Sequence, residues 1–258
     1  MSARRVLRAG GLYFDGINAY AVVGLRPDGS GKPFTVYGWS EITIAEWIYP
    51  YWPKVDSAFY NKFSMIGDYW VDYPSTFFRV DREQYYTSLD VRWVTRRSDG
   101  FSQIYQTSIY AYRNSWVHVV RRFTADREIS FWVNGNKMYA ATIPTTEKTV
   151  LEWDPDRATR PILYKRFVLG ANSFGTYDHM KLINDEVRIY NRALSGDEIK
   201  AIYERDELIK DGLVLCLDFT EGEGNIAYDK SGMGNHATIY GGARWVIKKA
   251  VRVLPKAR

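Results

Sequence analysis

The chain has 258 residues, of which 46% are hydrophobic and 25% are charged, and this balance excludes an intrinsically disordered protein. Its formal charge of +5 comes from 35 Lys and Arg set among 30 Asp and Glu, most of which form an ordinary solvated surface. A single cysteine, Cys216, excludes an internal disulfide. We expect no membrane span, because no apolar stretch has the required length, and no signal peptide is visible at the start.

Basic residues cluster at the two ends of the chain: Arg4, Arg5 and Arg8 at one end, and Lys248, Lys249, Arg252, Lys256 and Arg258 at the other. Two interpretations stay open, namely solubilising charge or contact with an anionic partner. Nucleic acid is not expected as a partner except through these ends. The scarcity of Gln hints at a thermophilic source.

Most of the chain alternates apolar and polar residues with a period of two, which predicts β-strands. In residues 41–49 the isoleucines are expected to face one side, and Ala45 and Trp47 the other. Further strands are expected at residues 20–25, 76–80, 87–94, 102–112, 116–123, 129–133 and 137–142. The pair Asn134-Gly135 tolerates positive φ and predicts a hairpin between the last two. Many short strands with regular turns indicate a sandwich or barrel.

One segment has a different pattern and predicts a short helix near residues 195–209. Ser195 is placed to cap its start together with Glu198, and Leu194 is placed to pack against Ile199. The helix face expected to lie on the sandwich consists of Ile199, Ile202 and Tyr203. Residues 145–160 show no clear period, so we expect a long surface loop there.

Several of these segments together resemble the laminin G-like, concanavalin A-like jelly-roll family of lectins and glucanases. The strongest resemblance is DEVRIYNRALSGDEIKAIY at residues 185–203. Similar signatures occur at residues 12–23, 42–50, 116–120, 131–135 and 169–172. The resemblance implies an all-β fold, a two-sheet antiparallel jelly-roll sandwich of concanavalin A type with one short helix.

The order of the segments departs from the family pattern. Residues 212–245 resemble the segment that usually precedes the FDG strand, yet here they come last. Leu213, Leu215, Leu217 and Phe219 are expected on one face of a strand. We expect one circularly permuted domain over residues 1–258, in which 212–246 supply the usual first segment and lie beside 185–190. The alternative is exchange of this segment with a neighbouring copy, which would make an obligate assembly.

The turn DKSGMGN at residues 229–235 resembles the family's DxSGNGN turn, which helps to hold a calcium ion in many relatives. By position, the resemblance implies Asp229, Asn235 and Asp185 as metal ligands, with Glu186 as a weaker fourth. Such oxygen donors suit a hard cation that takes six to eight ligands. The alternative is a Gly-rich turn held by Asx hydrogen bonds without a metal.

Aromatic residues in loop-like contexts are candidates for sugar binding, because such rings stack on the apolar faces of pyranose rings. The candidates are Tyr49, Tyr51 and Trp52 in one segment, and Trp70 and Tyr73 in another. The alternative is that these rings cover the sheets or a subunit interface.

No catalytic residue is predicted, and we expect a protein that is not an enzyme. The three histidines are scattered without zinc-ligand spacing. Retaining glucanases need two carboxylates on either side of the glycosidic bond, whereas Asp185 and Glu186 are adjacent and are expected to point to opposite faces.

Two hypotheses follow for the function. The first is a non-catalytic, lectin-like module that recognises a glycan or glycoprotein, with calcium as an expected cofactor, outside the cell or on a particle surface. The second is a structural protein of a multi-subunit assembly, such as a virion coat, a spike or a surface layer, which uses the sandwich as a building block. Fold analogy alone does not separate them.

Overall fold

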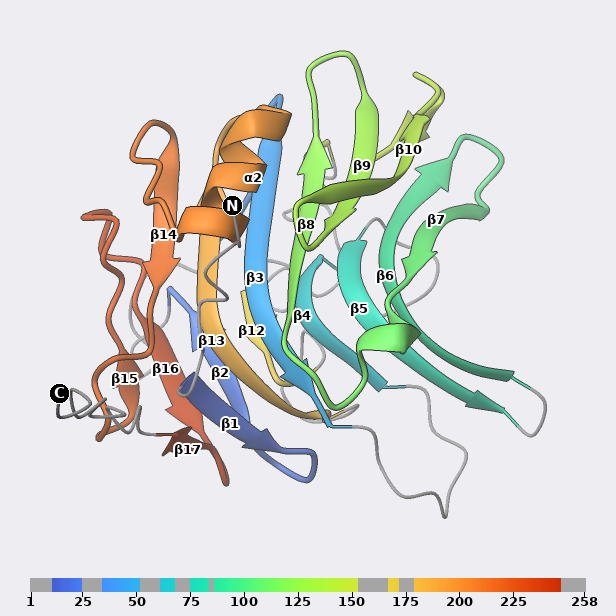
Figure 1. The fold of residues 1–258 in the computed structure, drawn as a ribbon. Coiled ribbons are helices and arrows are strands. Elements are labelled where there is room, and N and C mark those ends of the chain that lie inside the picture. The colour runs from blue at the N-terminus through green and yellow to red at the C-terminus, as the bar shows by residue number, and fades with distance from the viewer. Residues whose placement is uncertain are drawn as a thin grey trace, which may run out of the picture.

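The computed structural model describes residues 11–24, 34–51, 61–67, 75–83, 86–152, 167–171 and 179–246. Within these ranges the strands form two antiparallel sheets that face each other across one hydrophobic core (Figure 1). The expected all-β, two-sheet sandwich is confirmed. None of the helices in the described part is long and apolar enough to cross a membrane.

The first sheet has eight strands within the described residues. In spatial order they are β10 (Asn136–Thr142), β9 (Glu128–Val133), β8 (Val117–Phe123), β3 (Ile42–Pro50), β13 (Lys181–Tyr190), β1 (Gly11–Asp15) and β17 (Arg244–Val246), with β14 (Leu213–Leu217) paired to β13. Helix α2 (Gly196–Arg205) lies on the outer face of this sheet (Figure 1).

The second sheet has nine strands within the same described ranges. In order they are β11 (Glu147–Lys148), β6 (Tyr86–Arg97), β5 (Ser75–Glu83), β4 (Asn61–Gly67), β12 (Phe167–Leu169), β2 (Tyr20–Val23), β16 (Ala237–Tyr240) and β15 (Ile226–Ala227), with β7 (Ser102–Ser108) paired to β6.

Strand β14, from the C-terminal part of the chain, pairs with β13 in the middle of the first sheet. Val187 pairs with Leu217, and Ile189 pairs with Leu215. Strand β3 occupies one edge of β13, while β1 and β14 pair with its first and second halves on the other edge. The prediction that the residues after Gly212 form a strand beside 185–190 is therefore confirmed.

One detail of that prediction is wrong, because Leu213 does not share a face with Leu215 and Leu217. The register of the pair shifts between Ile189 and Tyr190, so an irregularity rotates the start of β14. Leu213 therefore packs under helix α2, whereas Leu215 and Leu217 point into the core between the sheets.

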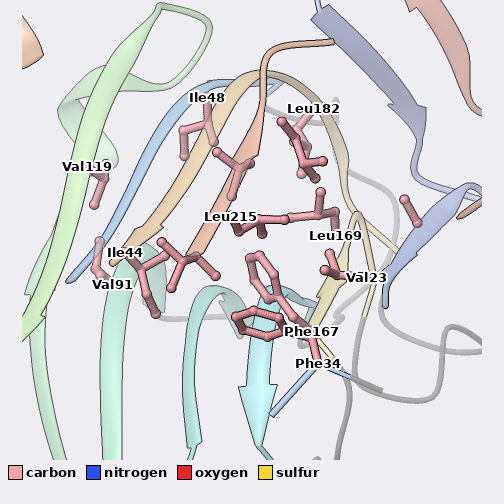
Figure 2. Packing of buried hydrophobic residues seen from close by; sticks show 14 of the residues in the cluster. Val23, Phe34, Ile44, Ile48, Val91, Val119, Phe167, Leu169, Leu182 and Leu215 are labelled. Carbon is pink, nitrogen blue, oxygen red and sulfur yellow. The ribbon is translucent and has the colours of Figure 1, made fainter. Parts of the chain in front are cut away.

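The core consists of almost completely buried aliphatic and aromatic side chains from both sheets and from segments between the strands. Figure 2 shows ten of them with labels, namely Val23, Phe34, Ile44, Ile48, Val91, Val119, Phe167, Leu169, Leu182 and Leu215. As expected, the isoleucines of β3 point inward, while Ala45 and Trp47 point outward to the helix side.

An ion pair lies inside this apolar core, which the alternation in the sequence did not reveal. Glu46 of β3 and Arg121 of β8 form a salt bridge with side chains only 0% and 1% exposed. Arg121 also donates to the Thr76 hydroxyl of the opposite sheet at 3.4 Å. The pair thus links the two sheets through a polar contact at their centre.

Helix α2 has the predicted start. The Ser195 hydroxyl accepts the Glu198 amide N–H at 3.2 Å, and the Glu198 carboxylate accepts the Ser195 N–H at 2.7 Å. Leu194 and Ile199 share one cluster of buried side chains, as a hydrophobic staple requires. The helix ends at Asp206, whose φ of 54° is left-handed.

Two predicted boundaries differ from the structure. Strand β7 ends at Ser108 and is followed by a 3-10 helix, η1 (Tyr110–Tyr112), where a continuous strand to 112 was expected. Part of the expected loop 145–160 forms β11 at the edge of the second sheet. Both differences occur at sheet edges, where pairing and not local alternation decides the ends of a strand.

Candidate functional site

Four aromatic side chains lie in one row on the outer face of the first sheet, away from helix α2. The cross-strand register places Tyr13 of β1 beside Ile183 of β13, and Ile183 beside Tyr49 of β3. Leu12 and Ile48, their chain neighbours, point into the core, so both tyrosines face outward. Three successive strands thus present their side chains side by side.

The rings contact one another in a continuous chain. Tyr13 meets Tyr51 edge-on with centroids 6.0 Å apart, and Tyr51 lies 4.9 Å from Tyr49. Tyr49 in turn meets Trp116, which precedes β8, at 5.6 Å. All four side chains are partly buried. We call Tyr13, Tyr49, Tyr51 and Trp116 the aromatic patch.

Next to the aromatic patch, helix α2 covers the outer face of the first sheet. Trp47, two residues before Tyr49 on the same face of β3, stacks on Tyr203 of helix α2 with centroids 5.7 Å apart. His118 stacks on the same tyrosine at 6.0 Å and is 1% exposed. The helix therefore covers one end of the outer face and leaves the patch at the other.

Two cations flank the aromatic patch. The Lys181 Nζ lies 5.3 Å from the centroid of Tyr51, and the Arg244 Cζ lies 5.2 Å from the centroid of Tyr13. Burial, helped by the neighbouring Tyr49 and Tyr13, raises the pKa of the Tyr51 hydroxyl, which therefore remains a hydrogen-bond donor at neutral pH. The patch thus combines apolar ring surface with hydroxyl and cationic donors.

Of the predicted platform residues, Tyr49 and Tyr51 lie together in a partly exposed cluster, and their role in sugar binding stays a prediction. Trp52, Trp70 and Tyr73 lie outside the described residues. The sequence analysis did not identify Tyr13 and Trp116, because it sought sugar-binding rings in loop segments and neither residue lies in a loop-like sequence. The alternation of the strand was the available signal for Tyr13, since it places this residue on the face opposite to the core residues Leu12 and Phe14.

The turn at 229–235 is built around the Asp229 carboxylate. One carboxylate oxygen accepts the backbone N–H groups of Cys216 and Ser231, both at 2.9 Å. The other accepts the Ser231 hydroxyl at 2.7 Å and the Asn235 N–H at 3.0 Å. The Asn235 side-chain amide donates to the Val214 carbonyl at 2.9 Å. The structure therefore brings Asp229 and Asn235 together through the turn itself.

The acids of β13 have other neighbours. Glu186 accepts the Arg188 Nε–H at 2.6 Å, and Arg188 also bonds the Asp206 carboxylate at the end of helix α2. Asp185 is 1% exposed and lies at a register shift in the pairing of β13 with β3. Within the described ranges, no three acidic, His or Cys side chains gather as a metal would require.

The carboxylate of Asp229 does not fit a calcium ion in its present arrangement, because its two oxygens already accept hydrogen bonds from four N–H and O–H groups. A cation would have to displace some of them. The arrangement matches the Asx-bonded turn that the sequence left open as the alternative. Calcium at Asp229, Asn235, Asp185 and Glu186 remains a prediction.

Comparison with known proteins gives a family match. The model of the concanavalin A-like lectin/glucanases superfamily, of laminin G type, matches residues 31–200. The match ends before β14. A search of curated proteins finds no match.

Several solved structures are similar to this chain at low sequence identity. A protein from Bacteroides ovatus, described as "a putative carbohydrate binding protein", is 17% identical with a TM-score of 0.59, over 94% of this chain and 61% of its own. The chain thus spans about three fifths of that protein's length. The receptor binding domain of botulinum neurotoxin D is 11% identical with a TM-score of 0.50, over 76% of this chain and 44% of its own. A heptameric SAP-like pentraxin from Limulus polyphemus is 11% identical with a TM-score of 0.48, over 93% of this chain and 96% of its own.

Proposed function

The chain belongs to the concanavalin A-like lectin/glucanase superfamily, and we propose that it is a carbohydrate-binding module whose sugar site is the aromatic patch. The single observation that carries the proposal is the row of contacting rings on the face that helix α2 leaves uncovered. Contiguous apolar surface marks interaction sites more often than scattered single apolar residues do. Tyrosine and tryptophan in particular offer a flat apolar face together with a polar donor, as sugar recognition requires.

We further propose that the module binds without cleaving. Retaining hydrolysis needs two carboxylates about 5 Å apart on either side of the scissile bond. Among the described residues, the acid nearest in sequence to Tyr13 is Asp15, which lies on the same face of β1. Its Oδ1 accepts the N–H groups of Ile17, Asn18 and Ala19, which fixes it as a turn residue. A reducing-sugar assay on bound polysaccharide is expected to show no product, and released sugar would contradict this part.

Substitution of single rings tests the site. Replacing Tyr49 or Trp116 by Ala should weaken binding of a recognised glycan by about tenfold in calorimetric titration, because each ring contributes area and stacking. Tyr240→Ala is the matched control, since Tyr240 stacks on Tyr20 at 4.9 Å on the second sheet. An unchanged Kd in Tyr49→Ala and Trp116→Ala, with circular dichroism intact, would refute the site.

For the domain organisation we propose one sandwich completed by its own C-terminal segment. The pairing of β14 with β13 of the same chain supports this. Native mass spectrometry should give the mass of one chain. Intertwined dimers, or larger particles at every concentration, would contradict it and favour the structural role in an assembly. A location outside the cell or on a particle surface remains a prediction.

A further inference from the structure

We infer that the glycan bound at the aromatic patch is anionic, carrying carboxylate or sulfate groups, an inference that rests on the proposed function. The first observation is the pair of exposed cations, Lys181 and Arg244, each lying over a ring of the patch. Neither forms an ion pair with a residue in the described part of the chain. Both charges are therefore available to a ligand.

The acids that lie closest along the strands are engaged elsewhere. Asp15 is the cross-strand partner of Lys181, but its carboxylate bonds three N–H groups of its own hairpin turn. Glu186, on the neighbouring stretch of β13, is paired with Arg188. Accepting N–H groups does not remove the charge of Asp15, so the field over the patch is that of the two cations together with this carboxylate.

The cation positions themselves select against a neutral sugar. A neutral ring that stacks on Tyr13 or Tyr51 displaces the cation that lies over it and so loses a cation–π contact. The displaced cation can donate a hydrogen bond to any sugar oxygen, but only an acidic sugar offers it a partner that is itself charged. The same geometry therefore favours an acidic ligand over a neutral one.

Matched polymers test the inference. Binding of polygalacturonate is compared with that of its methyl ester, and binding of dextran sulfate with that of dextran, so that each pair shares a sugar backbone and differs in its acidic groups. The full-length protein should bind the acidic member of at least one pair about tenfold more tightly, and the preference should shrink as salt rises. The two pairs distinguish carboxylate from sulfate.

Substitution of the two cations tests whether the preference for acidic polymers arises at the aromatic patch. Lys181→Gln with Arg244→Gln should reduce the preference for the acidic polymer to within about threefold. The control, Lys148→Gln with Lys200→Gln, removes two exposed cations elsewhere and should keep the preference. Equal affinity for charged and neutral polymers overturns the inference but leaves the proposed function intact. Tighter binding of single-stranded DNA that Tyr49→Ala does not weaken overturns it in favour of nucleic acid, and no binding of any polysaccharide overturns both proposals.

Discussion

Leu215 of β14 lies directly opposite Ile189 of β13, and both side chains are completely buried between the two sheets. A strand from near the end of the chain therefore supplies part of the central core. The strand that pairs with the second half of β13, β14, lies outside the range matched by the family model.

Leu215→Ala should accordingly lower the free energy of unfolding by about 2 to 4 kcal/mol, because it leaves a cavity in a packed core. Urea denaturation followed by tryptophan fluorescence measures the loss. Leu208→Ala is the control, since Leu208 is 44% exposed and should change stability by less than about 0.5 kcal/mol. Equal, small effects at both positions would mean that β14 does not contribute to the core.

The buried ion pair between Glu46 and Arg121 should respond differently to single and double substitution. Glu46→Ala should cost about 3 to 5 kcal/mol, because it leaves the Arg121 guanidinium buried without its partner. Glu46→Leu combined with Arg121→Met should recover most of that loss, since it removes both charges and keeps the volume. Denaturation of the three proteins measures this, and a double variant no more stable than the single one would contradict the argument.

The capping box of helix α2 should make stability depend on pH in the acidic range. The Arg192 guanidinium, and the Ser195 N–H, lower the pKa of Glu198 to about 2 from its ordinary 4.5. A group whose folded pKa is depressed stabilises the fold fully above its unfolded pKa and loses this contribution as pH falls through the folded value. The contribution should therefore decline between pH 4.5 and about 2, and it amounts to about 1 to 2 kcal/mol after allowance for solvent screening.

Glu198→Gln should be less stable than the native protein at pH 6 and nearly equal to it at pH 2. Thermal unfolding at both values measures the difference, with Glu204→Gln as an exposed control on the same helix. A deficit in Glu198→Gln that does not change with pH would show that charge plays no part in the cap.

The Asp229 turn should be stable without calcium. Asp229→Ala removes the acceptor of four hydrogen bonds and should cost about 2 to 4 kcal/mol. Because these donors already satisfy the carboxylate, adding a chelator to the native protein should leave its Tm unchanged. A Tm that falls with chelator and returns with calcium would instead support the metal site that the sequence resembles.

The fold was accessible from the sequence because its signals are local. Alternation in 41–49, the Asn134-Gly135 turn and the Ser195–Glu198 cap each specify an element through neighbours in the chain. Even the position of β14 followed from its resemblance to a segment with a known place. The inward Glu46 escaped notice because its partner, Arg121, is 75 residues away.

The site was only half accessible for the same reason. Tyr49 and Tyr51 are neighbours in sequence and were predicted together, whereas Tyr13 and Trp116 join them only through strand register. The irregularity that turns Leu213 away from the core likewise depends on pairing with β13. Neither register nor bulges can be derived from the alternation of one strand alone.

The most direct test of the central claim is nuclear magnetic resonance of the protein during titration with a glycan that it binds. We predict that the largest shift changes occur at the Trp116 indole and at the rings of Tyr13 and Tyr49. Changes confined to Tyr20 and Tyr240 on the second sheet, with the patch unperturbed, would contradict the account.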